Sequence, residues 1–154
     1  MLISLLKLHK LLLVFLIEPM MLYTDSFDIL FKSVNMHWVA TSSIVNKVSK
    51  LWCLSGPNLV QNFLVSDQFI FVTCLLHDKC FSFAGIYAAT SYLARWFLWM
   101  DLSSFTRSWC ILGDFNVVLS TDDCKRVALN QVSCNEFLNY LSCMPFYWIL
   151  LYLV

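Results

Sequence analysis

The chain has 154 residues, enough for one domain of ordinary size, and its ten basic residues balance its ten acidic ones. A formal net charge of zero excludes a bulk basic surplus, so any affinity for nucleic acid must come from a site. Hydrophobic residues make up 60% of the chain and charged residues 13%, whereas a typical soluble domain has about 25% charged residues. We therefore expect exposed apolar patches and self-association through them.

Two apolar runs near the ends of the chain raise the alternative of a signal peptide or a membrane anchor. The run Leu11–Ile17 follows a basic segment and stops at Glu18 and Pro19, and a second run covers Pro145–Val154. A bilayer span needs about 20 mostly apolar residues, so both runs are too short. Glu18-Pro19 is also a poor cleavage region for a signal peptidase. The sequence favours an intracellular protein, with a small membrane-associated or secreted protein as the alternative.

The seven cysteines do not form a familiar metal module. No two of them have C-x-x-C spacing, and no histidine lies near enough to complete a zinc site. Cys53, Cys74 and Cys110 lie within apolar runs, where a reduced cysteine behaves as a small core residue. The sequence therefore predicts reduced, buried thiols.

Short apolar runs rich in β-branched and aromatic residues predict the strands. In chain order these runs are Leu12–Ile17, His37–Ala40, Leu51–Leu54, Phe69–Leu75, Phe81–Tyr87 and Trp109–Leu112. The polar segment His77-Asp78-Lys79 separates the fourth and fifth runs by the length of a hairpin turn. We therefore expect these two runs to pair in antiparallel fashion.

Helices are predicted in fewer places. The first ten residues are consistent with the end of a helix that leads into the first strand. The segment Ser91–Phe105 has apolar residues at helical spacing, with Thr90 or Ser91 as the N-cap. The segment Asn135–Cys143 repeats that pattern, and Ser133 with Glu136 predicts a capping box.

This series of elements predicts an α+β fold in a single domain over residues 1–154. Strands in hairpins with a few helices between them are typical of a layered sandwich, in which helices flank a mostly antiparallel sheet. The sequence contains no internal repeat and no low-complexity linker.

The segment Gly113-Asp114-Phe115-Asn116, directly after the apolar run Trp109–Leu112, carries the strongest chemical signal. A carboxylate and, two residues later, an amide at the end of a sheet can hold a divalent cation, orient a water or bind a phosphate oxygen. An ordinary strand-ending turn is the competing interpretation, since Gly, Asp and Asn are common in turns.

Three other residues, at or soon after the ends of apolar runs, could contribute to the same chemistry. Glu18 ends an apolar run, and a carboxylate there is costly unless it is exposed or bound to a cation. Tyr87 closes the run Phe81–Tyr87, and Arg95 lies in the predicted helix that follows. Near a cation site, a tyrosine can bind a phosphodiester by hydrogen bonding and an arginine by charge. Packing and surface exposure are the ordinary roles of these two residue types.

The order of these segments resembles the endonuclease/exonuclease/phosphatase superfamily, especially the nuclease domain of plant LINE-type retrotransposons. The resemblance runs from about Leu11 to Leu141. It rests on Glu18-Pro19, Tyr87-Ala88, Arg95, Leu98-Trp99 and Gly113–Asn116, and it is extended by Trp109–Ser120, Asp123–Arg126 and Ser133–Leu138. It implies an incomplete copy of the DNase I-like fold, a partial four-layer α/β sandwich.

The resemblance also implies a role for each matching residue. Glu18 would be the metal-binding carboxylate, and Asp114 would orient or deprotonate the attacking water. Asn116 would bind the scissile phosphate, Tyr87 would stabilise the developing charge, and Arg95 would be a further substrate-binding residue. The implied cofactor is Mg²⁺ or Mn²⁺, and the implied partner is DNA, which extends the expected location to the nucleus.

Two motifs of the family have no counterpart in the chain. These are an asparagine-bearing strand before the Glu18 strand and a closing Ser-Asp-His motif; His9, His37 and His77 all lie in other contexts. A positioned proton-transfer group contributes typically about 10²–10⁴-fold to a reaction rate. We therefore expect a domain truncated at both ends, with a partial metal site and little or no catalysis.

Overall fold

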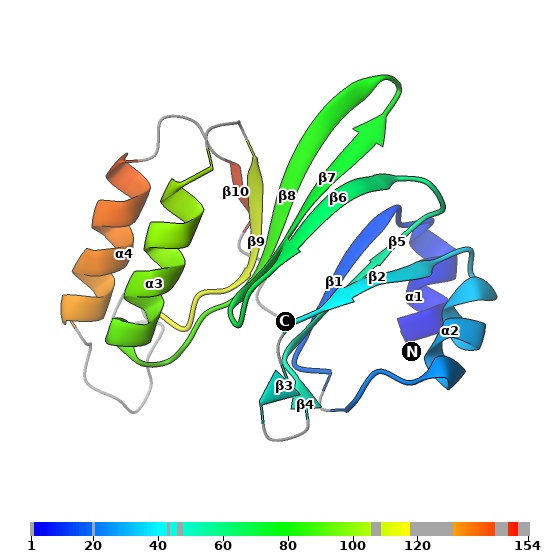
Figure 1. Ribbon diagram of the computed structural model, residues 1–154, viewed down its shortest axis with the longest axis horizontal. Helices are drawn as coiled ribbons and strands as arrows, with labels where there is room; N and C mark the ends of the chain where they lie inside the picture. Colours follow the sequence, from blue (N-terminus) through cyan, green and yellow to red (C-terminus); the bar gives the residue numbers. More distant parts are fainter. Residues whose placement is uncertain are drawn as a thin grey trace.

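The computed structural model describes residues 2–19, 21–42, 44–45, 48–105, 109–117, 131–143 and 148–150 (Figure 1). Its helices are α1 (Leu2–His9), α2 (Asp25–Lys32), α3 (Tyr92–Ser103) and α4 (Gln131–Cys143). Its strands are β1 (Leu13–Ile17), β2 (His37–Thr41), β3 (Ile44–Val45), β4 (Val48–Ser49), β5 (Leu51–Ser55), β6 (Val60–Val65), β7 (Phe69–Leu76), β8 (Lys79–Tyr87), β9 (Cys110–Asp114) and β10 (Trp148–Leu150). The expected α+β class is confirmed.

Two sheets form the centre of the molecule. In the smaller sheet, β5 lies between β1 and β2 and is antiparallel to both. The larger sheet has the order β10-β9-β8-β7-β6 and is mixed. Its pairs β6–β7 and β7–β8 are antiparallel, whereas β8–β9 and β9–β10 are parallel. A separate short ladder joins β3 to β4.

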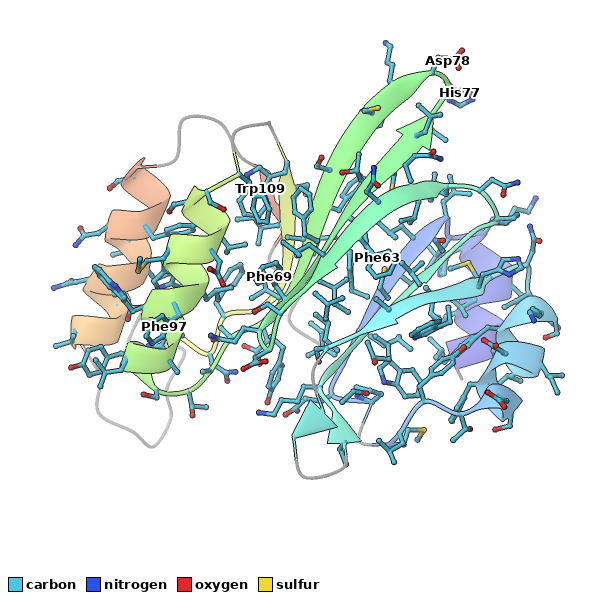
Figure 2. All side chains as sticks on the ribbon, viewed as in Figure 1. Phe63, Phe69, His77, Asp78, Phe97 and Trp109 are labelled. Carbon is cyan, nitrogen blue, oxygen red and sulfur yellow. The ribbon has the colours of Figure 1, made fainter. Side chains whose placement is uncertain are left out.

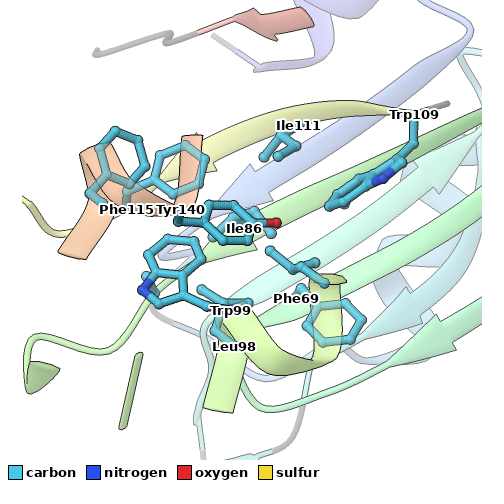
Figure 3. Packing of buried hydrophobic residues seen from close by; sticks show 12 residues of the cluster. Phe69, Ile86, Leu98, Trp99, Trp109, Ile111, Phe115 and Tyr140 are labelled. Carbon is cyan, nitrogen blue, oxygen red and sulfur yellow. The ribbon is translucent and has the colours of Figure 1, made fainter. Parts of the chain in front are cut away.

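Side chains alternate along the strands and divide the interior into three apolar clusters. One cluster fills the space between the small sheet and α1 and α2, and a second lies between the two sheets. The third packs the large sheet against α3 and α4 (Figures 1 and 3). In β7, Phe69 belongs to the third cluster and Ile70 to the second, as the period of two in a strand requires. The layers therefore run helices, sheet, sheet, helices.

The predicted hairpin between β7 and β8 is confirmed. Leu76 pairs with Lys79, which leaves His77 and Asp78 as a two-residue turn at the tip (Figure 2). Their φ angles are 49° and 61°, as a type I′ turn requires at both central positions. This turn matches the twist of the flanking strands and so fixes the register of the pair.

One of the two predicted helix N-caps is found and the other is not. Ser91 occupies the N-cap position of α3, although its side chain makes no capping hydrogen bond. The capping box is wrong because α4 begins at Gln131, which places Ser133 within the helix. Glu136 instead accepts a hydrogen bond from the Trp99 indole. The segment Asp123–Arg126 lies outside the described residues.

Two of the three cysteines predicted in apolar runs are buried, and large apolar side chains are exposed. Cys53 and Cys74 are buried, and burial raises the pKa of Cys53 to about 12 and that of Cys74 to about 11. Cys110 is only partly buried. Large apolar side chains are exposed on the helices, where Ile29 is 76% accessible and Phe97 is 67% accessible. Figure 2 labels Phe97 on α3. Self-association through such surface stays a prediction.

No helix within the described ranges combines the length and the apolar character that crossing a bilayer requires.

Candidate functional site

Four of the predicted site residues converge where β1, β8 and β9 end. Because β8 and β9 are parallel, Tyr87 lies opposite Asp114 in the ladder and both leave the sheet at the same edge. The Tyr87 hydroxyl donates a hydrogen bond to a carboxylate oxygen of Glu18, which follows β1 in the other sheet. Asn116 also lies within hydrogen-bonding reach of Tyr87. The site therefore spans the two sheets.

Glu18 is held by the continuation of the small sheet. Its backbone N–H donates to the Lys50 carbonyl at 2.8 Å, one step beyond the pairing of Ile17 with Leu51. The Glu18 side chain is exposed, which removes the cost of a buried, uncompensated carboxylate. Its φ of 48° is uncommon for a residue other than glycine and marks the point where the chain turns away from the strand.

The close approach of the two sheets depends on a glycine. A Cβ atom added to Gly85 in β8 would lie only 2.5 Å from Cγ of Phe15 in β1. The absent side chain lets the Phe15 ring pack directly on the β8 backbone. This packing brings the end of β1, and with it Glu18, within reach of Tyr87.

A second glycine shapes the end of β9. Gly113 has a φ of 145°, and an added Cβ atom would lie 2.7 Å from the backbone nitrogen of Ile86. Beyond it, the Ala88 N–H donates to the Asp114 carbonyl at 2.8 Å, which extends the pairing of β8 with β9. The Asn116 N–H donates to Oδ1 of Asp114 at 2.8 Å, and its Nδ2 donates to the Ala88 carbonyl at 2.6 Å. Asp114 and Asn116 are therefore fixed relative to each other.

Tyr87 is a neutral hydrogen-bond donor in this setting. The hydrogen bond to Glu18 raises the pKa of Tyr87 to about 12, and burial and the charges of Glu18 and Asp114 act in the same direction. Hydrogen bonding with Asn116 opposes this shift. The phenol consequently keeps its proton throughout the neutral pH range.

Sequence reasoning missed one residue of the site, Lys50. Its Nζ atom lies 5.0 Å from the centroid of the Tyr87 ring, within the range of a cation–π contact. A single lysine before an apolar strand is common, and nothing local in the sequence connects it to Tyr87. Only the pairing of β5 with β1, and the packing of β1 on β8, brings the two residues together.

Arg95 lies behind the site. Its guanidinium is fully buried and donates through NH1 to the carbonyls of Ala89 at 2.8 Å, Thr90 at 2.9 Å and Asn116 at 3.3 Å. Its NH2 lies 3.6 Å from Oε2 of Glu136 in α4. This placement favours support of the Asn116 segment over contact with a substrate.

The three histidines lie away from these residues. His9 ends α1. His37 pairs with Ser55, at the end of the small sheet that is farther from Glu18. His77 forms the hairpin tip, at the far end of β8 from Tyr87. A histidine is therefore not available here for proton transfer.

The donor set suits a hard cation that keeps much of its water. Glu18 and Asp114 each have one carboxylate oxygen that accepts no hydrogen bond from the described residues. Those residues include no cluster of three or more His, Cys, Asp or Glu side chains able to hold a metal ion. Two carboxylates with water completing the shell fit Mg²⁺ or Mn²⁺, whereas a structural Zn²⁺ site needs four protein ligands.

Neither the known protein-family models nor the curated proteins include a match to this chain.

Proposed function

We propose that the chain is a phosphodiester-binding domain, similar to the endonuclease/exonuclease/phosphatase superfamily, that holds a divalent cation and turns over little or no substrate. The observation that carries the proposal is the convergence of Glu18, Tyr87, Asp114 and Asn116 at one edge of two facing sheets. The resemblance assigns metal binding and phosphate chemistry to these four residues and a further substrate-binding role to Arg95, which lies buried behind them. A DNA substrate would place the site of action in the nucleus.

The layered architecture supports the same proposal. A helix–sheet–sheet–helix order with Glu18 and Asp114 on facing sheets is consistent with a partial DNase I-like sandwich. In such an arrangement, the ends of strands from two sheets supply one binding edge. The Tyr87–Glu18 hydrogen bond joins the two halves of that edge.

Each residue has a chemical role at this edge. The exposed oxygens of Glu18 and Asp114 would hold Mg²⁺ or Mn²⁺, with water in the remaining positions. When bound, such an ion neutralises charge on a phosphoryl oxygen. The Asn116 amide would donate its second N–H to a phosphate oxygen, and the neutral Tyr87 hydroxyl would stabilise charge there by donating its one proton to the phosphate instead of to Glu18.

The same arrangement argues for slow turnover. Asp114 is the candidate base, but its Oδ1 already accepts the Asn116 N–H, and all three histidines lie elsewhere. A missing proton-transfer group lowers a rate by typically about 10²–10⁴-fold, and missing stabilisation of transition-state charge by about a further 10²–10³-fold. Binding of the ion and the phosphate does not need that missing group.

A plasmid-nicking assay tests the proposal, run on the monomeric, folded chain with Mg²⁺ beside an Asp114→Ala variant. Binding of a short oligonucleotide, with and without Mg²⁺, is measured on the same samples. We expect Mg²⁺-dependent binding that Asp114→Ala weakens, with no nicking above background. Nicking that the variant abolishes would contradict the low turnover, and the absence of both binding and nicking would overturn the function.

A small membrane-associated or secreted protein remains the second candidate. The exposed apolar side chains of Leu8, Ile29 and Phe97 are the observation in its favour. Extraction of the expressed chain with salt or with detergent separates the two candidates. A chain that requires detergent and shows no affinity for divalent ions would favour the membrane-associated protein.

A further inference from the structure

The backbone of Lys50 is fixed beside the proposed site. Its neighbours Ser49 and Leu51 are buried, and its carbonyl accepts the Glu18 N–H at 2.8 Å. The Trp52 indole donates to Oγ of Ser49 at 2.5 Å, which holds this stretch against the small sheet. Lys50 therefore lies directly before β5, at a place fixed by its backbone hydrogen bond with Glu18.

The Lys50 side chain points toward the same group of residues. Its ammonium lies 5.0 Å from the centroid of the Tyr87 ring, and the hydroxyl of that ring donates to Glu18. Within the described part of the chain, the ammonium forms no ion pair with a carboxylate. Its positive charge and its three donors are thus available to an anion from outside the protein.

We propose that Lys50 binds the phosphodiester at this site by its charge and, by the same charge, lowers the affinity of the site for a divalent cation. The inference rests on the proposed function. A unit positive charge on the Tyr87 ring, whose hydroxyl donates to Glu18, attracts a phosphate and repels a metal ion at this site. Arg95 cannot take this role where it lies, because its guanidinium is fully buried behind Asn116.

A purely structural role for Lys50 makes a different prediction. If the side chain only covered the Tyr87 ring, its removal would loosen Tyr87 and Glu18 together and weaken the binding of both ligands. A charge effect moves the two affinities in opposite directions. The sign of the change therefore separates the two roles.

The test compares Lys50→Met and Lys50→Gln with wild type and with Lys79→Met. Lys79 is exposed at the hairpin end of β8, far from Tyr87, so its variant controls for the change in net charge. Binding of Mn²⁺ alone is measured by electron paramagnetic resonance, and binding of dithymidine monophosphate in the presence of saturating Mg²⁺ is measured by ³¹P NMR. Both are measured at low ionic strength, because salt screens such interactions.

We expect both Lys50 variants to bind Mn²⁺ about threefold more tightly and the dinucleotide about three- to tenfold more weakly, whereas Lys79→Met changes neither. Lys50→Arg keeps the charge and should keep the wild-type order of affinities. Equal weakening of both ligands, or unchanged affinities in both variants, would overturn the assignment of Lys50 alone. If the wild type binds neither Mn²⁺ nor the dinucleotide, the proposed function is overturned, and the role of Lys50 with it.

Discussion

The ends of β9 and β1 each carry one carboxylate of the site, but the structure holds them in different ways. Asp114 is the last residue of the paired strand β9, and its segment is tied to Ala88 by two hydrogen bonds and to Arg95 by a third. Glu18 is exposed and is held by the Lys50 carbonyl and the Tyr87 hydroxyl. We call Asp114 with Asn116 the Asp114 half of the site, and Glu18 the Glu18 half. The Asp114 half is built into the large sheet, whereas the Glu18 half depends on how closely the small sheet packs on the large one.

The core behind each half shows the same difference. Trp99 and Phe115, the residue after Asp114, pack together in the core (Figure 3). Phe137 packs against both, and the three ring centroids lie 5.0–6.1 Å apart. The close contact of Phe15 with Gly85 is what places β1 against β8. We infer that disturbance of the Asp114 half unfolds the protein, whereas disturbance of the sheet contact first separates Glu18 from the rest of the site.

Gly113→Ala should have the largest effect. The added methyl group would meet the Ile86 backbone, and the φ of 145° strains any other residue, so we expect a loss of more than about 4 kcal/mol in unfolding free energy. Gly56→Ala is the matched control, because its Cβ atom would lie 3.7 Å from the nearest atom and should change stability by no more than about 1 kcal/mol. Urea unfolding measures both variants. A Gly113→Ala variant as stable as Gly56→Ala would contradict the close approach of Gly113 to the Ile86 backbone.

Arg95→Met should destabilise the Asp114 half by about 3–5 kcal/mol, because it leaves the Glu136 carboxylate facing a buried apolar side chain. Replacing both residues, as in Arg95→Met with Glu136→Leu, should recover part of that loss. The free energy of unfolding in urea reports both effects. If Arg95→Met kept full stability and only weakened oligonucleotide binding, Arg95 would be a substrate-binding residue after all.

Gly85→Ala should move the Glu18 half away from the Asp114 half with a smaller loss of stability. The methyl group would overlap the Phe15 ring and push the sheets apart, which costs about 1–3 kcal/mol in stability. The Tyr87–Glu18 contact should be lost, so Mn²⁺ affinity falls more than the stability loss explains. Phe15→Ala combined with Gly85→Ala should partly restore Mn²⁺ binding, as expected for residues in direct contact. Unchanged Mn²⁺ affinity in folded Gly85→Ala would contradict the dependence of Glu18 on sheet packing.

The smallest expected effect is a dependence on alkaline pH. The folded-state pKa of Tyr87 is raised to about 12 from an ordinary value near 10, so the folded state favours the protonated phenol. Its contribution is complete below about pH 10 and is lost as the pH rises through about 12. Because the site is partly exposed, we expect about 1 kcal/mol, seen as a shallower fall in stability for Tyr87→Phe. Identical pH profiles for the two proteins would contradict the Tyr87–Glu18 hydrogen bond.

Local signals in the sequence predicted local features of the fold. The turn at His77 and Asp78 needs only its flanking apolar strands, and the hairpin forms as expected. Strand β6 was missed because Gln61 and Asn62 interrupt the alternation of apolar residues. The ladder has a register irregularity between Val60 and Asn62, so the pattern changes face within the strand. Helix α2 was missed although Thr24 takes its N-cap position and Asp25 lies in its first turn.

In the site, too, the sequence predicted the residues that local strand ends position, and it did not predict contacts between distant segments. The positions of Tyr87, Asp114 and Asn116 could be predicted because each residue lies at, or just after, the end of a strand that the sequence predicts. The burial of Arg95 could not, since the carbonyls and the Glu136 carboxylate that compensate its charge come from three separate segments. Lys50 was missed for the same reason, because only the packing of the two sheets brings it to Tyr87.

A cation site shared by Glu18 and Asp114 is tested most simply by Mn²⁺ binding to the folded chain. The binding is compared with that of Glu18→Gln, Asp114→Asn and a control, Asp78→Asn. Asp78 carries the same charge at the hairpin tip, remote from the site (Figure 2). We expect one bound ion per chain, about tenfold weaker binding in each site variant because one ligand charge is removed, and no change in the control. Binding that survives in both site variants, or that falls equally in Asp78→Asn, would contradict a cation site shared by Glu18 and Asp114.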